Sequence, residues 1–332
     1  MCQDLSKAAC TVYLKTEGSK ELNLLRKRLL AITGGVTFIA TALVTTFGIL
    51  ATNRLMFLKI KDAEVVLKRE SIARRFDAHW YETVPKTTMR IQSPNGYLLH
   101  AIYLRPLDTT RTVIICHGVT ENKINSMKFA RMFERLGFNS IVYDHRRHGE
   151  SGGKTTSFGF YEKMDLRAII QAVRERIGKR ALLGIHGESM GAATMILTAG
   201  TYPEEADFYI ADCPFSDFTA QVFHILKTTT PLRTPKVIRI ANIFLKIRDG
   251  YTTSLVSPKQ VVAQVAQPML FIHSLEDDFI LPSMTEELYD HKNGAKSIKL
   301  FPKGAHARSF NENPEEYEAT VRRFLRKYGF LN

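Results

Sequence analysis

The chain has 332 residues, of which 45% are hydrophobic and 24% are charged. This balance is typical of a folded domain and does not indicate disorder, a fibrous repeat or a protein with many membrane spans. The length is sufficient for one large domain with an additional segment. The four cysteines have neither the spacing of metal ligands nor the density of a disulfide framework: Cys2, Cys10, Cys116 and Cys213.

The formal net charge of +13 raises the question of nucleic-acid binding. Residues 1–78 contain 13 Lys/Arg and 7 Asp/Glu, a net charge of +6, so the positive excess is densest beside an apolar segment. No helix-turn-helix, zinc-finger or aromatic RNA-binding motif accompanies it. We therefore expect contact with anionic lipid headgroups and no nucleic-acid partner.

Residues 29–52 contain no charged side chain and follow the basic cluster RKR at residues 26–28. This length is enough for a helix to cross the hydrocarbon core of a bilayer. An A-x-A-like cleavage site is missing, which favours an uncleaved anchor over a signal peptide, and the length argues against a buried core helix. We predict a basic flank at residues 1–28 and a single-pass transmembrane anchor at 29–52.

The orientation of this anchor does not follow from charge counts, since each side carries five Lys/Arg within twenty residues. The compact cluster at residues 26–28 favours an inside amino terminus, so the catalytic domain is expected to be extracytoplasmic. Residues 1–24 differ from the usual start of a signal sequence, which a natural start downstream of them would explain.

Residues 53–78 have mixed charge and a helical pattern, and we expect a juxtamembrane helix there. From residue 79 to 332, short aliphatic runs alternate with amphipathic stretches, as a mostly parallel sheet with crossover helices requires. The pattern predicts a single α/β domain. The expected strands are residues 89–92 and 98–104, which form a hairpin, then 112–116, 140–143, 181–186, 208–211, 269–273 and 297–301, and the last helix is expected near 315–327.

The strongest local signal is GESMG at residues 187–191, a G-x-S-x-G sequence between a strand-like and a helix-like segment. In this context the glycines permit a sharp turn that exposes the hydroxyl of Ser189, and the helix amino terminus favours negative charge nearby. We interpret Ser189 as a nucleophile and not as part of an ordinary turn.

A serine hydroxyl needs a base to remove its proton. His306 follows the last expected strand, where the chain order serine, acid, histidine places the base. Of the later histidines, His224, His273 and His291 are better explained by structural roles. The acid should follow the strand at 269–273, and spacing alone leaves three carboxylates open there: Glu276, Asp277 and Asp278.

Backbone amides that face the oxyanion are also required for acyl transfer. Met190 follows the nucleophile, and Val119 follows His117-Gly118 at the end of the strand at 112–116, so these two amides are the candidates for an oxyanion hole. The segment GESGGKT at 149–155 differs from a phosphate-binding loop at one glycine, and no metal motif is present. We expect no cofactor.

The motifs over residues 80–332 resemble those of the α/β-hydrolase superfamily, particularly the bacterial membrane-anchored branch related to serine aminopeptidase-like and acyl-esterase-like hydrolases. The resemblance is carried, in the family's order, by CHGVTENKINS, YDHRRHGESGGKTTSFGFYEKMDL, HGESMGAAT, ADCPFSDF, FIHSLEDDFILPSM and KGAHARSF.

This resemblance implies that Asp277 is the catalytic acid, because it stands four residues after the strand-ending His273 and three before Ile280. The proline usual beside that aliphatic residue is displaced to Pro282, which keeps Asp278 as an alternative, and Ser274 replaces a frequent glycine. It also implies a lid at about residues 217–258. Six of its apolar side chains could line an acyl-binding cleft or simply pack on the domain: Phe223, Ile225, Leu226, Ile243, Phe244 and Leu245.

The expected function is hydrolysis of a carboxylic ester or related acyl bond of a small-molecule or lipid-like substrate, by the triad Ser189, Asp277 and His306. A peptidase or an acyltransferase of the same fold is the first alternative. A non-catalytic binding protein on a hydrolase fold is the second. The motifs indicate neither the natural substrate nor the oligomeric state.

Overall fold

The structure is a computed structural model that describes residues 2–203, 205–231 and 233–332, without the side chains of residues 2–19 and 21. The side chains of Cys2 and Cys10 and part of the basic flank at 1–28 therefore lie outside the described residues. The chain divides into two compact units, residues 1–51 and 52–332.

The first unit is a continuous part of helix α1 (Cys2–Met56), whose last turn belongs to the second unit. Apolar side chains are exposed along it between residues 22 and 50. Within the described residues, one helix is long and apolar enough to cross a membrane, judged by length and composition, and it covers Leu22–Met56.

The second unit is built on an eight-stranded sheet with the order β1-β2-β4-β3-β5-β6-β7-β8. β1 and β2 pair antiparallel, β2 also pairs antiparallel with β4, and all other neighbours are parallel. The strands are β1 (Lys86–Gln92), β2 (Leu98–Leu104), β3 (Thr112–Cys116), β4 (Asn139–Tyr143), β5 (Leu183–Glu188), β6 (Phe208–Asp212), β7 (Met269–Ser274) and β8 (Lys296–Phe301).

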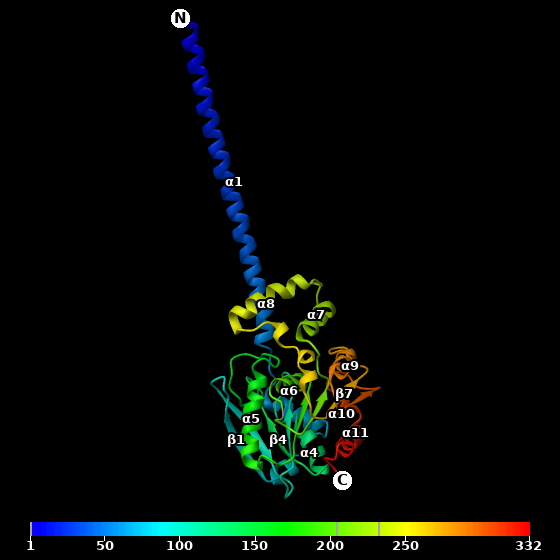
Figure 1. The fold of residues 1–332 in the computed structure, drawn as a ribbon. Coiled ribbons are helices and arrows are strands. Elements are labelled where there is room, and N and C mark those ends of the chain that lie inside the picture. Colours follow the sequence, from blue (N-terminus) through cyan, green and yellow to red (C-terminus); the bar gives the residue numbers. More distant parts are fainter. Residues whose placement is uncertain (1, 204, 232) are drawn as a thin grey trace. The chain divides into compact units, whose positions relative to one another are not determined.

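The helices of this unit cover both faces of the sheet. One apolar core contains side chains of α5, α6 and α9, and the other contains side chains of α4, α10 and α11, so the sheet is the middle of three layers (Figure 1). The helices are α2 (Ala63–Ile72), α3 (Ala78–Thr83), α4 (Met127–Arg135), α5 (Glu162–Ile177), α6 (Met190–Thr201), α7 (Phe218–Thr229), α8 (Pro235–Asp249), α9 (Pro282–His291), α10 (Ser309–Glu312) and α11 (Pro314–Lys327).

The central strands alternate between these two cores, as the twofold period of a strand requires. In β3, Ile114 and Cys116 pack in the first core, whereas Val113 and Ile115 pack in the second. The strand is therefore apolar throughout, which is typical of a parallel strand covered on both faces.

The expected α/β-hydrolase fold with a mostly parallel sheet is confirmed, and all eight expected strands are present with ends shifted by no more than three residues. The largest shift is at β1, which begins at Lys86 and not at residue 89. Its first three residues are exposed or half-buried, so they carry no apolar signal.

The segment at 53–78, expected as one juxtamembrane helix, contains the end of α1, a loop and α2. The helix α3 follows, and Asp77 caps it by accepting a hydrogen bond from the Trp80 amide at 3.0 Å. In the expected lid segment, 217–258, the structure places α7 and α8, and residue 232 lies outside the described residues.

Candidate active site

The turn between β5 and α6 presents Ser189 in a strained backbone conformation. Its φ of 56° and ψ of −118° are rare for a residue with a Cβ and cost about 1–3 kcal/mol. The flanking glycines are required by close packing. A Cβ on Gly187 would lie 2.5 Å from the Gly191 carbonyl oxygen, and a Cβ on Gly191 would lie 2.2 Å from the Cys116 carbonyl oxygen. The G-x-S-x-G pattern is thus a steric requirement of this turn.

The loops after β7 and β8 bring the expected acid and base to Ser189. The Ser189 hydroxyl oxygen lies 2.8 Å from His306 Nε2, and His306 Nδ1 lies 2.7 Å from Asp277 Oδ2. Ser189 and Asp277 are buried, and His306 is about one-fifth exposed in its side chain. With the proton on Nδ1 donated to the carboxylate, Nε2 is free to accept the serine proton.

The other two acidic residues of the loop have different partners. The Glu276 carboxylate accepts a hydrogen bond from the Gly304 amide at 2.9 Å, and the backbone carbonyl oxygen of Asp278 lies 2.8 Å from Nε2 of His224. Within the part of the chain that the structure describes, neither Glu276 nor Asp278 contacts His306. Of the three acidic residues that the spacing left open, Asp277 is the one whose carboxylate contacts His306.

The carboxylate of Asp277 accepts four hydrogen bonds. Its Oδ1 accepts from the amides of Phe279 at 3.0 Å and Ile280 at 2.9 Å, and its Oδ2 accepts from His273 Nε2 at 3.1 Å as well as from His306. Burial raises the pKa of Asp277, but the hydrogen bonds from His273 and His306 outweigh burial, and the net pKa lies well below its ordinary value. The carboxylate is therefore ionised at neutral pH.

His273 is a residue whose contact with the site the sequence did not reveal. We interpreted it as the structural end of a strand, and it is the last but one residue of β7. Its ring also contacts the Thr285 hydroxyl at 2.7 Å and the Ile280 carbonyl at 2.9 Å, so it links β7, the Asp277 loop and α9. The spacing of four residues between His273 and Asp277 was the feature of the sequence that could have indicated this contact.

The loop after β3 contains Val119, one of the two expected oxyanion donors, and it lines the same cavity as Ser189. His148 Nε2 accepts a hydrogen bond from the Thr120 amide at 3.1 Å, and burial lowers the pKa of His148 to about 3. The neutral ring is therefore available as an acceptor. Thr120 has a φ of 66°, an uncommon value for a β-branched residue, so the loop is held in a defined shape.

Met190, the second expected donor, is the first residue of α6, and its side chain is buried. Among the described residues, neither the Val119 amide nor the Met190 amide donates a hydrogen bond to the protein. An amide at the first turn of a helix has no partner within that helix, so the Met190 N–H is available to a ligand.

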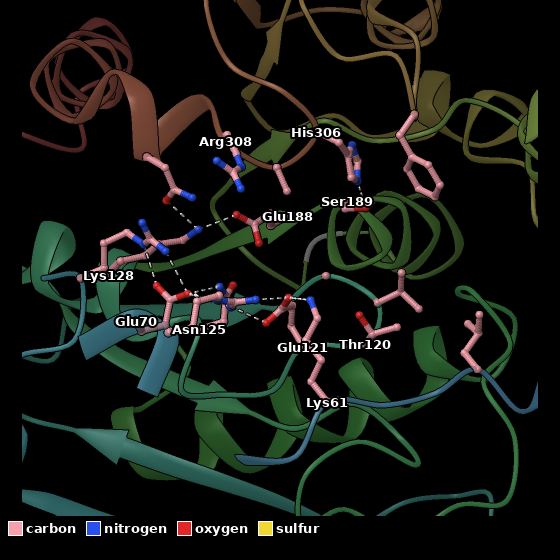
Figure 2. Close-up of a pocket in the computed structure, with 18 residues that line it drawn as sticks. Lys61, Glu70, Thr120, Glu121, Asn125, Lys128, Glu188, Ser189, His306 and Arg308 are labelled. Carbon is pink, nitrogen blue, oxygen red and sulfur yellow. Dashed lines mark hydrogen bonds and ion pairs between the residues drawn. The ribbon is translucent and has the colours of Figure 1, made fainter. Parts of the chain in front are cut away.

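A cavity of about 470 Å³ adjoins Ser189 and His306, and it is rich in charge (Figure 2). Eight of the 18 residues that line it are ionisable Lys, Arg or Glu side chains. We name these eight the charged wall: Lys61, Arg69, Glu70, Arg75, Glu121, Lys128, Glu188 and Arg308.

Two glutamates of the charged wall are bound by the segment that precedes the sheet. Glu121 accepts hydrogen bonds from Arg69 Nη2 at 2.7 Å and from Lys61, and Glu70 accepts from Arg75 Nε at 2.7 Å. Burial raises the pKa of Glu121, but hydrogen bonds from Arg69 and Lys61 outweigh it and lower that pKa to about 2. No sequence motif indicated that residues 61–75 reach the active site.

The third glutamate, Glu188, precedes the nucleophile and forms a buried ion pair. Its Oε1 lies 2.8 Å from Lys128 Nζ, and the two side chains are 3% and 2% exposed. Desolvation of both charges makes such a pair sensitive to loss of either partner. The six lid side chains that could have formed an acyl-binding cleft do not line this cavity.

Two described clusters have enough ligand atoms for a metal ion: Cys213 with Asp277 and His306, and His100 with Asp144 and Glu150. The first overlaps the Ser189 site. In the second, the ammonium group of Lys123 lies 2.5 Å from Asp144 and 2.6 Å from Glu150, so a cation already occupies the position between the carboxylates.

Comparisons with known proteins agree with this architecture. The family described as serine aminopeptidase S33 matches residues 108–255. The Bacillus subtilis (strain 168) uncharacterized protein YqkD is 44% identical over 302 residues, which are 91% of this chain and 97% of YqkD. The Arabidopsis thaliana α/β hydrolase domain-containing protein WAV2 is 23% identical over 248 residues, or 72% of this chain and 78% of WAV2.

Among solved structures, the Pyrococcus furiosus esterase Pf2001 has a TM-score of 0.61 at 22% identity, covering 74% of this chain and 92% of the esterase. Mouse α/β hydrolase domain-containing protein 10 has a TM-score of 0.57 at 17% identity, covering 73% and 99%. These structural likenesses support the fold, and the extensive identity to YqkD supports a closer relationship. The chain belongs to the same family as YqkD, within the α/β hydrolases, and its residues 108–255 are similar to the serine aminopeptidase S33 family.

Proposed function

We propose that the protein is a serine hydrolase that cleaves a carboxylic ester or a related acyl bond through Ser189, His306 and Asp277. The observation that carries this proposal is the continuous hydrogen-bonded chain from the Ser189 hydroxyl through both His306 nitrogens to Asp277. The strained turn at Ser189 supports it, because backbone strain of this kind is concentrated at functional sites.

In the proposed reaction, the Ser189 oxygen attacks the ester carbonyl while His306 Nε2 takes the serine proton. Asp277 stabilises the resulting imidazolium, and the Val119 and Met190 amides bind the oxyanion. His306 then donates its proton to the leaving alcohol as the carbon–oxygen bond breaks. Water, deprotonated by His306, attacks the acyl-enzyme, which releases the acid and restores Ser189.

Ser189→Ala tests the proposal. The variant should lose labelling by a fluorophosphonate probe and lose turnover of short 4-nitrophenyl esters, while circular dichroism remains that of the wild type. Ser254→Ala is the matched control, because Ser254 is exposed in the lid segment and bonds only locally to Thr252. Labelling of Ser189→Ala at the wild-type level would exclude Ser189 as the nucleophile.

An aminopeptidase is the alternative that the family description suggests. Recognition of a peptide amino terminus needs a carboxylate available to an ammonium group. The glutamates of the charged wall each bind Lys or Arg already, which supports an ester over a peptide substrate. Comparing alanine 4-nitroanilide with 4-nitrophenyl acetate separates the two, and faster turnover of the anilide would favour the peptidase. Product analysis with added alcohol would detect acyl transfer.

We also propose that α1 anchors the protein in a membrane through residues 29–52, with the catalytic domain on the extracytoplasmic side. The apolar Leu22–Met56 helix and the basic cluster at 26–28 support this arrangement. The protein should stay with membranes after a carbonate wash, and a membrane-impermeant fluorophosphonate should label intact cells. Recovery in the soluble fraction would exclude the anchor, and labelling only after lysis would reverse the orientation.

A further inference from the structure

The cavity beside Ser189 contains a dense set of charged side chains. Four of its 18 lining residues are apolar, and eight carry a charge. These charged groups provide hydrogen-bonding partners for a polar or charged part of a substrate.

The charge of this cavity is positive overall. Its charged wall has five cationic side chains and three glutamates, a formal excess of two positive charges. Each glutamate is within 2.8 Å of at least one Lys or Arg. The Lys and Arg side chains of the charged wall thus neutralise its carboxylates, and the excess positive charge is available to an anion.

Arg308 differs from the other cations of the charged wall. The nearest carboxylate it approaches is Glu312, at 3.7 Å and outside the cavity lining, and its side chain is 61% exposed. By contrast, Arg69 and Lys128 bind buried glutamates, Glu70 and Glu188, at 2.7 and 2.8 Å. A ligand could bind Arg308 without breaking a buried ion pair.

The position of Arg308 connects it with the reacting groups. It follows His306 by two residues and lines the same cavity as Ser189, His306 and Glu188, which are drawn with it in Figure 2. A group bound there would hold the rest of the substrate near the nucleophile.

We propose that this cavity binds an anionic group of the substrate, a carboxylate or a phosphate, and that Arg308 is its specificity-determining contact. The inference rests on the proposed function, because it names the class of ester that Ser189 cleaves. A planar guanidinium binds either anion with two parallel hydrogen bonds. The anion can belong to a water-soluble ester or to a lipid headgroup.

Two pairs of substrates test the proposal, with one member of each pair lacking the anion. The soluble pair is mono(4-nitrophenyl) adipate against 4-nitrophenyl hexanoate. The lipid pair is 1-oleoylglycerol 3-phosphate against 1-oleoylglycerol in the same mixed micelles. A higher kcat/KM for the anionic member of either pair supports the proposal, and the pair in which it occurs identifies the source. Equal kcat/KM for the anionic and neutral members in each of the two pairs would overturn the proposal.

Arg308→Gln should reduce kcat/KM for the anionic ester by about tenfold or more, since a hydrogen bond to a charged group is lost. The change should be mainly in KM, because the contact is made in the ground state and the transition state alike. The loss should be smaller for the neutral ester, so the ratio of kcat/KM for the anionic ester to that for the neutral ester should fall. Arg308→Lys keeps the charge, so its kcat/KM for the anionic ester should lie between those of the wild type and Arg308→Gln. Arg326→Gln on α11 is the control. A preference that survives Arg308→Gln would refute the role of Arg308.

Binding of free adipate to the Ser189→Ala protein, measured by calorimetry, separates the subsite from catalysis. Binding that weakens about tenfold with Arg308→Gln supports the subsite even if Ser189 proves not to be the nucleophile. Equal affinity of Ser189→Ala and Ser189→Ala/Arg308→Gln for adipate would overturn the proposed subsite without affecting the proposed hydrolase activity.

Discussion

His273 Nε2 lies 3.1 Å from Oδ2 of Asp277, four residues further along the chain. This is the same carboxylate oxygen that accepts the hydrogen bond from His306. Both side chains of the His273–Asp277 pair are buried. His273 therefore fixes the orientation of Asp277 independently of the loop that carries His306.

His273→Gln should lower kcat for a 4-nitrophenyl ester by about 10- to 100-fold with a small change in KM, because displacement of Asp277 misorients His306. Steady-state kinetics measure this, with His291→Gln as the control. His291 is exposed on α9, and its ring lies 2.7 Å from the Glu287 carbonyl oxygen of the same helix, away from the Asp277 loop. A wild-type kcat for His273→Gln would show that the loop amides alone position Asp277.

Asp277→Asn should reduce kcat by about 10⁴-fold, since the amide cannot stabilise the imidazolium and favours the wrong tautomer. Glu276→Gln and Asp278→Asn should each retain most of the activity, because neither carboxylate contacts His306 in the described structure. The three variants measured together identify the acid. A comparable loss in Asp278→Asn would reassign it.

Lys128→Met should destabilise the fold by about 3–5 kcal/mol, because it leaves the Glu188 carboxylate buried without a counter-charge. The double variant Lys128→Met/Glu188→Gln should recover a large part of that loss, since it removes both charges. Urea unfolding measures the free energies. Equal stability of the single and double variants would show that Glu188 does not depend on Lys128.

Asp212 should contribute stability at pH 4 that is lost as the pH rises to about 7, whereas the buried neutral His148 contributes in the opposite direction. Burial, followed by the charge of Glu188, raises the pKa of Asp212 to about 7, whereas an unfolded aspartate titrates near pH 4. Between these values Asp212 of the folded protein holds a proton that the unfolded chain has released, so through this group raising the pH favours unfolding.

Asp212→Asn should remove this contribution, so the melting temperature of the variant minus that of the wild type should increase as the pH rises through this window. The asparagine stays neutral and can still accept the hydrogen bond from Ser309, which is 3.1 Å from Asp212 Oδ1. Scanning calorimetry from pH 4 to pH 8 provides the comparison, with the exposed Asp290→Asn on α9 as control. Parallel curves for wild type and Asp212→Asn would contradict the raised pKa.

The sheet and the turn at Ser189 could be predicted because their signals are local. Parallel strands covered on both faces read as short aliphatic runs, and the two glycines around Ser189 are needed where a Cβ would collide with backbone. The positions of His306 and of the acidic loop followed from chain order in the fold. The choice of Asp277 needed either a resemblance or the three-dimensional contact with His306.

The charged wall could not be predicted, because it joins segments that are far apart in the sequence. Arg69 and Glu121 are separated by 52 positions, and their contact depends on how α2 packs beside the loop after β3. A mixed-charge helix is more often a solvated surface, so the charges of residues 61–75 gave no reason to place them at Ser189. Only the packed structure reveals that they neutralise buried glutamates.

The neutralised glutamates of the charged wall also constrain how a new substrate preference can arise by mutation. Replacement of Lys128 alone passes through a protein in which the buried Glu188 has no counter-charge, so this position can change only together with Glu188. Arg308 has no such dependence and can be replaced in a single step. In related hydrolases, the residue at position 308 should therefore vary independently, whereas the two members of a buried ion pair should be replaced together.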